Sequence, residues 1–346
     1  MHKSFLFGIF LILPAFAFTQ GYQQSPVDFA KALSPKGKNT QIIGQEIAKT
    51  FDSELDRLKA AYAFTATHIA YDQRMADLSR NGRLDTNFSK YALAHGLGFC
   101  QHYAQTFREI TQSMGFKSYL VGGYVKNQNG EIAERSHAWN AVLLDSGLYF
   151  FDPTFGSGYT LKGRFVPQYD ESYFMVPPQK MIKTHKPFHP VFQGLSNPKS
   201  HPEFMSGTKK ESENAWSIVD SLKARSRLSE LEKAQSLKYY LKQEKNFHPL
   251  LKERYLEAHE SITSQLYNQG AQLLNSGIDH YNAYQKLRTS NSEKAQRHLE
   301  TAEEKALRAQ KIFSQLQSRE DNLQSMIRRA RKESQTLISA ISKQGD

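Results

Sequence analysis

Proline and glycine are distributed unequally along this chain of 346 residues, and this limits what each half can fold into. After the proline-rich stretch 187–202 only Pro249 remains, and glycine becomes rare. Both residues interrupt helices and mark turns, so their near absence favours long helices. The length also exceeds one ordinary domain of roughly 100 to 200 residues. We therefore expect two domains, of which the second, residues 205–346, is all helical.

The second half carries apolar residues in alternating steps of four and three. Such a heptad seam is typical of coiled coils and of helices that pack along their whole length. Four more apolar residues would lie on a preceding helix: Leu266, Leu273, Ile278 and Tyr281. We expect a helical hairpin or small bundle, which is also the expected contact for a protein partner. The seam consists of Ala295, Leu299, Ala302, Ala306, Ala309, Phe313, Leu316, Leu323, Ile327, Ala330, Leu337 and Ile341.

The first half changes from helix to strand at Gly115. Residues 20–49 contain a turn at 34–37 and are expected to form an N-terminal arm. Apolar residues at three- and four-residue steps predict one helix from Asp52 or Ser53 to just before Asp72, and a second from Cys100 to Gly115. Stretches rich in aromatic and β-branched residues predict strands at 116–125, 136–144 and 148–152. The order predicts an α+β domain in which helices precede an antiparallel sheet.

The N-terminus has the pattern of a signal peptide. Lys3 precedes an apolar run over residues 5–13, Pro14 interrupts this run, and Ala15-Phe16-Ala17 offers small residues for cleavage. The run is shorter than the roughly 20 residues that a spanning helix needs, and no later stretch qualifies. We expect residues 1–19 to be removed and the chain to be secreted or periplasmic, without a membrane span.

Charge and motifs give little reason to expect a cofactor or nucleic acid. The formal charge of +11 favours anionic partners, but the basic residues are scattered among acidic ones. We find no zinc-finger spacing, RNP-like motif or phosphate-binding glycine loop, so no specific nucleic-acid partner is expected. We find no acidic loop of EF-hand type, so neither a calcium site nor another cofactor or metal is expected.

Cys100 is the single cysteine of the chain. In an oxidising compartment cysteines usually pair, so Cys100 would be a free thiol or form an intermolecular bridge. A buried, inert side chain is the alternative. Its position favours chemistry, because the N–H groups in the first turn of a helix stabilise a thiolate.

A nucleophilic cysteine also needs a histidine, and most candidates fail on position. His102 lies two residues further along the helix, turned about 200° away from Cys100. Pro187 lies between His185 and His189 and prevents a helix that would align them, so we expect loop histidines there. Two further histidines are not followed by a carboxylate in a rigid element, namely His68 and His95.

His137 differs because it stands on an expected strand whose hairpin partner ends at Asp152. A hairpin brings the two residues together. In a simple register, however, Asp152 would lie nearer Asn140, about 10 Å from His137 at roughly 3.3 Å per residue. The pair therefore requires a bulge or a longer loop.

Three short boxes in this order resemble those of the transglutaminase-like superfamily, which has a papain-like core. The resemblance covers about residues 50–195, so we place this domain at 50–200. Two downstream segments are similar to the kyphoscoliosis-peptidase branch: Tyr173-Phe174-Met175-Val176-Pro177-Pro178 and His185-Lys186-Pro187. The boxes are Gly98-Phe99-Cys100-Gln101-His102-Tyr103-Ala104, Ser136-His137-Ala138-Trp139-Asn140 and Phe151-Asp152-Pro153-Thr154-Phe155-Gly156.

The resemblance implies roles for these residues. Cys100 would be the nucleophile, His137 the base, and Asp152 the residue that orients the base. The helix that bears the cysteine would pack on an antiparallel sheet. In the family, a backbone N–H of the nucleophile and an upstream side chain hold the oxyanion, and Tyr71 is the candidate for the latter, with a core tyrosine as the alternative. Phe155 stands where the family often has Trp, which removes no catalytic group.

These roles predict acyl transfer on protein amide or peptide bonds through a thioester. Water as the acceptor makes a peptidase or amidase, whereas a lysine amine makes a crosslinking transglutaminase. We favour hydrolysis because of the kyphoscoliosis-peptidase resemblance. The alternative from another class is a non-catalytic extracytoplasmic scaffold, which would not require all three residues.

Overall fold

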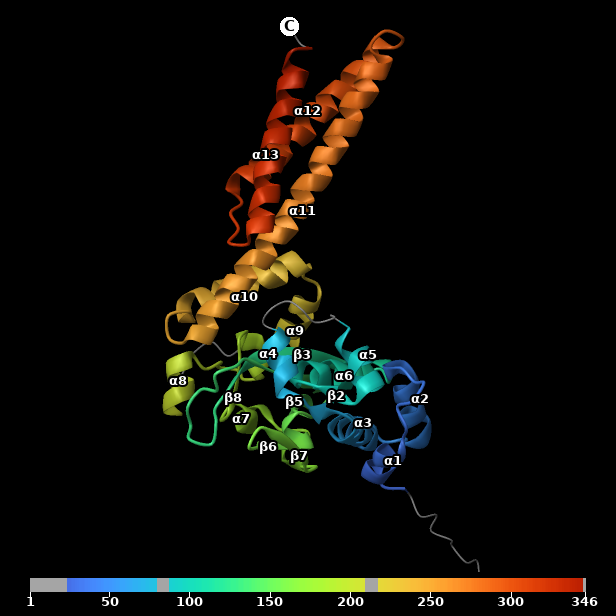
Figure 1. Ribbon diagram of the computed structural model, residues 1–346, viewed down its shortest axis with the longest axis vertical. Coiled ribbons are helices and arrows are strands. Elements are labelled where there is room, and N and C mark those ends of the chain that lie inside the picture. Colours follow the sequence, from blue (N-terminus) through green and yellow to red (C-terminus); the bar gives the residue numbers. More distant parts are fainter. Residues whose placement is uncertain (1–23, 80–86, 209–216, 345–346) are drawn as a thin grey trace, which may run out of the picture.

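The computed structural model describes residues 24–79, 87–208 and 217–344, which form two regions (Figure 1). The first mixes helices with strands and the second is all helical, as the distribution of proline and glycine predicted. Helix α11 (Pro249–Leu287) runs from the mixed region into an elongated helical column. The predicted signal peptide, residues 1–19, lies outside the described residues.

The segment predicted as an N-terminal arm is largely helical. Helices α1 (Pro26–Ala32) and α2 (Thr40–Thr50) precede α3 (Glu54–His68). The Asn39 side chain accepts a hydrogen bond from the Ile42 N–H and caps α2. Ile43 and Ile47, one turn apart, are fully buried in the same core as Phe64 of α3. Residues 40–50 are therefore part of the domain core and not an arm, because this i, i+4 apolar pair holds them there.

Cys100 begins α6 (Cys100–Ser113), as the sequence predicted. The helix buries a stripe that includes Tyr103, Phe107 and Ile110. The chain leaves it through Gly115, whose φ of 91° lies in the left-handed region that favours glycine. Upstream lie β1 (Ala70–Tyr71), α4 (Gln73–Ser79), α5 (Phe88–His95) and β2 (Leu97–Gly98), with β1 and β2 paired in parallel.

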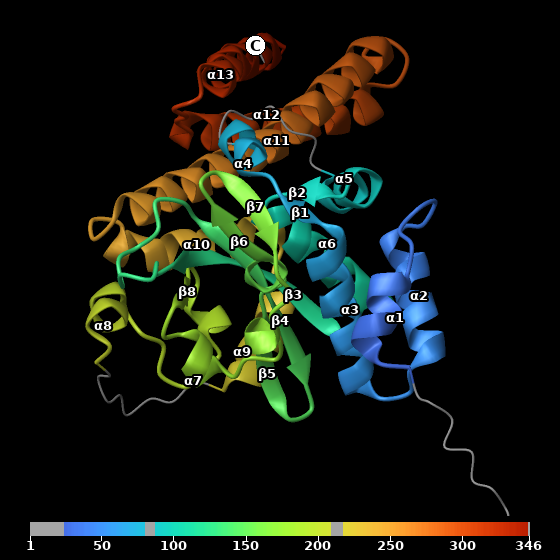
Figure 2. The ribbon, with the colours of Figure 1, turned by 60° about the horizontal axis from the view of Figure 1, so that its bottom comes forward.

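A four-stranded antiparallel sheet in the order β5-β4-β3-β8 forms the centre of the mixed region (Figure 2). Its strands are β3 (Lys117–Val125), β4 (His137–Leu144), β5 (Gly147–Phe151) and β8 (His185–Pro187). One face packs against α3 and α6, where Val142 and Phe151 join Phe107. The opposite face buries Trp139 and Phe150 against α7 (Pro178–Met181), η3 (Pro190–Gln193) and α9 (Ile218–Ser226).

Three of these strands were predicted, whereas β8 was expected to be a loop. Proline is tolerated on the edge of a sheet, and β8 is an edge strand that pairs only with β3. The shorter elements of the mixed region are η1 (Phe155–Ser157), the hairpin of β6 (Gly158–Leu161) and β7 (Arg164–Pro167), η2 (Glu171–Tyr173) and α8 (His201–Ser206).

The helical column consists of α11, α12 (Ser292–Gln315) and α13 (Asp321–Ser342), which lie side by side (Figure 1). Every residue of the predicted heptad seam is buried. The four residues predicted on a preceding helix all lie on α11. Leu266, Leu273 and Tyr281 pack against this core, whereas Ile278 is 37% exposed. Gly270 lets α11 approach closely, because a Cβ there would come within 2.7 Å of the Phe313 ring. The predicted small bundle is a three-helix bundle.

The helical region is attached to the mixed region through α10 (Glu230–Glu244) and the start of α11. Leu241 and Leu251 are fully buried against Tyr124 of β3. An ion pair of 2.8 Å joins Nζ of the buried Lys186 on β8 to the half-buried Glu244 of α10. These contacts fix the first turns of α11 beside the sheet.

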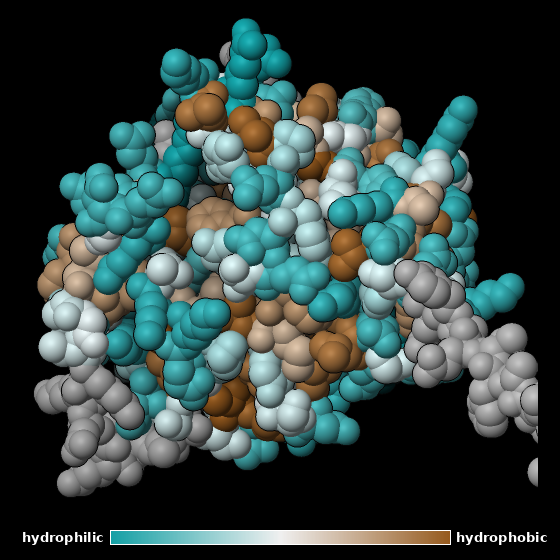
Figure 3. All heavy atoms as spheres, turned by 90° about the horizontal axis from the view of Figure 1, so that it is seen from below, coloured by the Kyte–Doolittle hydropathy of each residue, from teal (hydrophilic) through white to brown (hydrophobic). Residues whose placement is uncertain are grey.

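The surface of the mixed region is mostly hydrophilic on the side away from the bundle. Figure 3 shows teal residues over much of this face, with hydrophobic residues in small groups between them. Among the residues that the structure describes, no helix combines the length and the apolar character needed to cross a membrane.

Candidate active site

Cys100 is the first residue of α6 and is partly exposed. The start of the helix is fixed by His102, whose Nδ1 accepts a hydrogen bond of 3.3 Å from the Phe99 N–H. Gly98 makes room for this ring, because a Cβ at Gly98 would lie 2.5 Å from the His102 Cβ. His102 thus faces away from the reacting sulfur, as predicted, and serves to hold the helix start that carries it.

His137 is the first residue of β4, and its ring is held from several sides. Its Nε2 lies 2.6 Å from Oδ2 of Asp152. The Phe155 ring packs against it at a centroid distance of 4.7 Å, and Trp139 stacks at 5.9 Å. Because Nε2 is bound to Asp152, Nδ1 is the ring nitrogen left to act on a neighbouring group. The structure therefore brings His137 and Asp152 together, as the sequence predicted.

The register of the hairpin explains this contact without a bulge. Asn140 pairs with Phe151, and the ladder continues regularly to the pair of Leu144 with Gly147. Asp152 follows Phe151, so it lies one same-face step from His137 along the strand direction. Diagonal neighbours on a sheet are about 7 to 8 Å apart at their backbones, which two long side chains can bridge. The expected bulge is not needed, because the true register is more favourable than the one assumed.

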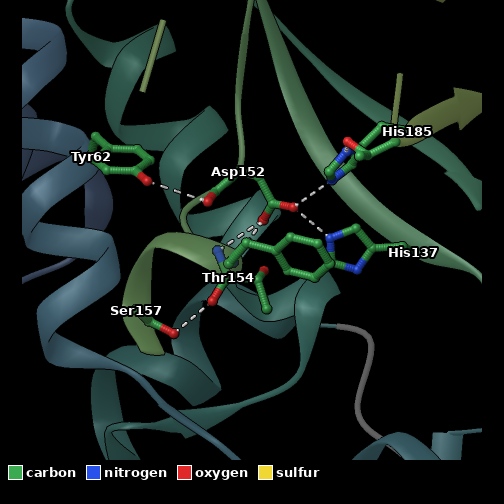
Figure 4. A network of polar contacts seen from close by, with 8 residues as sticks. Tyr62, His137, Asp152, Thr154, Ser157 and His185 are labelled. Atoms are coloured by element: carbon green, nitrogen blue, oxygen red, sulfur yellow. Dashed lines mark hydrogen bonds and ion pairs between the residues drawn. The ribbon is translucent and has the colours of Figure 1, made fainter. Parts of the chain in front are cut away.

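Asp152 is fully buried, and its carboxylate is surrounded by donors (Figure 4). Oδ1 accepts the N–H groups of Thr154 and Phe155 at 3.0 and 3.1 Å. Oδ2 accepts from His137 and also faces Nε2 of His185 at 3.2 Å. Burial alone would raise the pKa of Asp152, but the charge and hydrogen bond of His137 and the hydrogen bond of His185 lower it well below its ordinary value. Asp152 therefore stays ionised.

Side-chain hydrogen bonds hold the backbone of the loop that follows Asp152. The Tyr62 hydroxyl of α3 donates to the Asp170 carbonyl at 2.8 Å and lies 3.5 Å from that of Asp152. The Ser157 hydroxyl donates to the Thr154 carbonyl at 2.7 Å, as Figure 4 also shows. The backbone that presents Asp152 is thus held by side chains from two elements.

The charge of Asp152 changes the protonation of His137. Burial would lower the pKa of His137, but the charge of Asp152 and hydrogen bonds to Asp152 and Cys100 together raise it above its ordinary value. The hydrogen bond to Cys100 places the thiol on the side of the ring opposite Asp152. This arrangement favours an imidazolium at His137.

Cys100 and His137 open into a cavity of about 610 Å³. Tyr71 and Phe155 also line it, so the oxyanion candidate lies in the same cavity as the thiol. One wall belongs to the helical region. It is formed by the first turns of α11, namely Leu250, Glu253, Arg254 and Glu257.

His185 is the site residue that the sequence analysis missed, because it was expected in a loop. It is buried on β8, and its Nε2 lies 3.2 Å from Oδ2 of Asp152. A clue was present in the resemblance of residues 185–187 to a known branch of the family. His189 lies outside the site, in the segment before η3, as expected for a loop histidine. Its Nδ1 accepts a hydrogen bond from the Val191 N–H and caps η3.

Three of these side chains could be considered as metal ligands. Donor atoms of His137, Asp152 and His185 lie within 4.8 Å of one another. Two ligands on one zinc ion are about 3.3 Å apart at tetrahedral geometry and bond lengths near 2.0 Å. The 2.6 Å between His137 Nε2 and Asp152 Oδ2 is shorter and fits a charge-assisted hydrogen bond. The cluster is better described as a hydrogen-bonded group than as a metal site.

A cysteine at a helix start, packed on an antiparallel sheet that carries the histidine and aspartate, defines a transglutaminase-like domain. The family model described as "Transglutaminase-like superfamily" matches residues 42–153. Members of this superfamily are generally cysteine-dependent enzymes. Part of the chain is also similar to kyphoscoliosis peptidases.

The similarity to individual proteins is partial. Kyphoscoliosis peptidase of Mus musculus is 31% identical over 169 residues, which cover 46% of this chain and 25% of that protein. The Homo sapiens protein is 28% identical over 193 residues, which cover 54% and 28%. A solved structure described as a TGase has a TM-score of 0.28 and 23% identity, over 39% of this chain and 36% of that one. The chain thus matches about a quarter of the length of its curated relatives.

Proposed function

We propose that this chain is an exported cysteine enzyme that hydrolyses protein amide or peptide bonds through Cys100, His137 and Asp152. The observation that carries the proposal is the position of His137 between the Cys100 thiol and the buried Asp152 carboxylate. The relatives named as peptidases support hydrolysis over amine transfer. Export rests on the signal-peptide pattern of residues 1–19 alone.

The first step forms a thioester. The Cys100 thiolate attacks the carbonyl carbon of the scissile amide, and the charge moves to the carbonyl oxygen. The imidazolium of His137 then gives its Nδ1 proton to the departing amine as the tetrahedral intermediate collapses. Asp152 holds the proton on Nε2 and stabilises the cationic ring, so that Nδ1 is the nitrogen that exchanges protons.

The second step regenerates the thiol. Neutral His137 takes a proton from water, whose oxygen attacks the thioester carbonyl, and the acid product leaves as the sulfur recovers its charge. A lysine amine in place of water would give an isopeptide bond by the same chemistry. Cys100 is partly exposed beside the cavity, so water can reach the thioester.

Two donors are proposed for the developing oxyanion. The Cys100 N–H belongs to the first turn of α6, where backbone N–H groups are not used within the helix. The Tyr71 side chain lines the same cavity and packs in the cluster that contains Cys100. Together they would act on the oxygen from two directions.

Thiol alkylation tests the proposal without knowledge of the substrate. At pH 6, Cys100 should react with iodoacetamide much faster than a free cysteine, whose pKa is about 8.5. The variant His137→Ala should abolish the difference, with His102→Ala as a control from the same helix end. Ordinary reactivity in the natural chain would instead support a non-catalytic scaffold.

A second assay separates the two enzyme classes. The chain without residues 1–19 is incubated with casein and a labelled primary amine, and new termini and incorporated label are followed together. We expect new termini with little label. Incorporated label without cleavage would replace hydrolysis by amine transfer.

A further inference from the structure

We propose that His185 is a positioning residue of this active site: a neutral imidazole whose Nε2–H holds the ionised Asp152 in the orientation that His137 needs. The proposal rests on the proposed function, because it assigns a task within the same catalytic group. It goes beyond the triad, which requires only Cys100, His137 and Asp152.

The geometry places two imidazoles on one carboxylate oxygen. His137 Nε2 and His185 Nε2 lie 2.6 and 3.2 Å from Oδ2 of Asp152. Oδ1 is occupied by the backbone N–H groups of Thr154 and Phe155. The carboxylate therefore accepts from four donors. The side chains of His137, Asp152 and His185 are each at most 8% exposed. Figure 4 shows the two rings approaching Asp152 from different strands.

The two polar neighbours of His185 define the position of its proton. The Thr184 hydroxyl oxygen lies 2.8 Å from Nδ1 of His185. An ionised carboxylate can only accept, so Nε2 must carry a proton toward Asp152. In the neutral ring Nδ1 is then unprotonated, and it accepts a hydrogen bond from the Thr184 hydroxyl. The two contacts together select a single tautomer.

The surroundings keep His185 neutral. Burial lowers the pKa of His185, and the charge of His137 lowers it further, against the opposing effect of Asp152. The titratable groups that face the ring are Asp152, His137 and Tyr173, whose ring centroid is 6.2 Å away. Lys186, the next residue on β8, is paired with Glu244 of α10. A neutral donor stabilises Asp152 without adding a second cation that would compete with His137.

The sheet has a feature that permits this approach. Gly123 of β3 lies between β4 and β8, where it pairs with His137 on one side and Pro187 on the other. A Cβ at Gly123 would lie 2.5 Å from the Trp139 ring and 2.3 Å from the Lys186 carbonyl oxygen. The absence of a side chain lets Trp139 and β8 close over this position. The Trp139 ring then meets His185 edge to face at 5.2 Å.

A matched pair of amides tests the role of Nε2. In His185→Gln the amide nitrogen can occupy the position of Nε2 and donate to Asp152, whereas the shorter amide of His185→Asn falls near Nδ1 and cannot reach. The readout is the iodoacetamide alkylation rate of Cys100 between pH 4 and 8. Because Cys100 is the single cysteine, alkylation reports on it alone. Far-UV circular dichroism and thermal melting establish that each variant is folded.

We expect His185→Gln to stay within about 3-fold of the natural chain. His185→Asn should alkylate about 10- to 100-fold more slowly at pH 5 to 6, the size expected when one charge-assisted hydrogen bond is lost. The pH below which Cys100 alkylation becomes slow should also be higher in His185→Asn, because Asp152 is protonated more readily with three donors than with four. Equal rates in the two folded variants, whether fast or slow, would overturn the proposal, since a packing role does not distinguish them.

Thr184→Val gives a test that does not depend on a buried substitution. It keeps the shape of the side chain and removes the hydroxyl, so the His185 ring loses the contact that orients it and alkylation should slow by several-fold, with Thr184→Ser near the natural rate. An unchanged rate in Thr184→Val would contradict a role of the Thr184 hydroxyl in positioning His185. Failure of the proposed function has a separate signature: the natural chain itself would alkylate like a free cysteine at every pH.

Discussion

The two regions of the molecule bury opposite kinds of side chain. The three-helix bundle closes on a seam that is mostly apolar and carries no buried charge among the described residues, with Ala302, Ala306 and Phe313 fully buried. The mixed region encloses a fully buried carboxylate, Asp152, and its partner His137. Burial of apolar area stabilises by about 25 cal/mol per Å², whereas burial of an ion costs several kcal/mol unless it is well paired. A group kept at such a cost is expected where chemistry requires it.

The comparison also indicates how the regions depend on each other. The bundle is distant from the thiol, but the first turns of α11 form one wall of the cavity. Changes in the distal bundle should therefore alter stability and leave the chemistry intact, while changes at the start of α11 should alter substrate binding. The predictions below test this division, from the largest expected effect to the smallest.

Asp152→Asn should have the largest effect among the variants that keep the shape of the site. The amide cannot hold a proton on Nε2 of His137 as the carboxylate does, so amide hydrolysis should fall by about 10³- to 10⁴-fold. The measurement is kcat/KM on a cleaved protein substrate, with melting temperature as the check on folding. Activity within 10-fold of the natural chain would remove Asp152 from the mechanism.

Ile327→Ala should destabilise the bundle and spare the chemistry. Ile327 is fully buried in α13, and truncation to Ala in a core costs about 2 to 5 kcal/mol. The neighbouring Met326 is 47% exposed, so Met326→Ala is the matched control, with a change of about 0.5 kcal/mol or less. Denaturant unfolding gives the free energies. Loss of fast Cys100 alkylation in folded Ile327→Ala would show that the regions are not separable.

The ion pair of His137 with Asp152 should also affect how the stability depends on pH. The pKa of His137 is raised from 6.5, so its contribution is complete below pH 6.5 and declines as the pH rises toward the folded value. The pKa of Asp152 is lowered from 3.8, so its contribution is complete above pH 3.8 and declines on acidification. The stability difference between the natural chain and Asp152→Asn should therefore be greatest between pH 3.8 and 6.5. If the difference in stability between these two proteins did not vary with pH, this would contradict an ion pair between His137 and Asp152.

Glu253→Ala should have the smallest effect and the most specific one. Glu253 is exposed on the wall that α11 contributes to the cavity. We expect a change in KM of a few-fold with kcat and the alkylation rate unchanged, because the residue meets the substrate but not the reacting atoms. Glu303→Ala, exposed on α12 away from the cavity, is the control. Equal KM values in both variants would remove α11 from the substrate-binding surface.

The sequence predicted those parts of the structure that have a local signal. The heptad seam is a periodic pattern, and every residue assigned to it is buried. Ile278 lies on the preceding helix as predicted, although its side chain is 37% exposed and does not belong to the buried face. Helix α6, which begins at Cys100 and ends at Ser113, was likewise predicted from its apolar stripe and from Gly115 just beyond its end.

Parts that depend on distant pairing were harder to predict. His185 reaches the site only because β8 pairs with β3, about 60 residues upstream, and nothing in residues 185–187 alone indicates that partner. Pro187 also favoured a loop, although an edge strand accepts proline. The helical nature of residues 40–50 could have been found, since Ile43 and Ile47 are spaced as one turn of an amphipathic helix.

The central claim is that His137 is an imidazolium held between the Cys100 sulfur and Asp152. Nitrogen-15 NMR of histidine-labelled protein tests it directly, with His137 assigned by its loss in His137→Gln. We expect both ring nitrogens of His137 to carry protons at pH 7 and to remain protonated well above pH 6.5. A neutral His137 ring at pH 7 would contradict it.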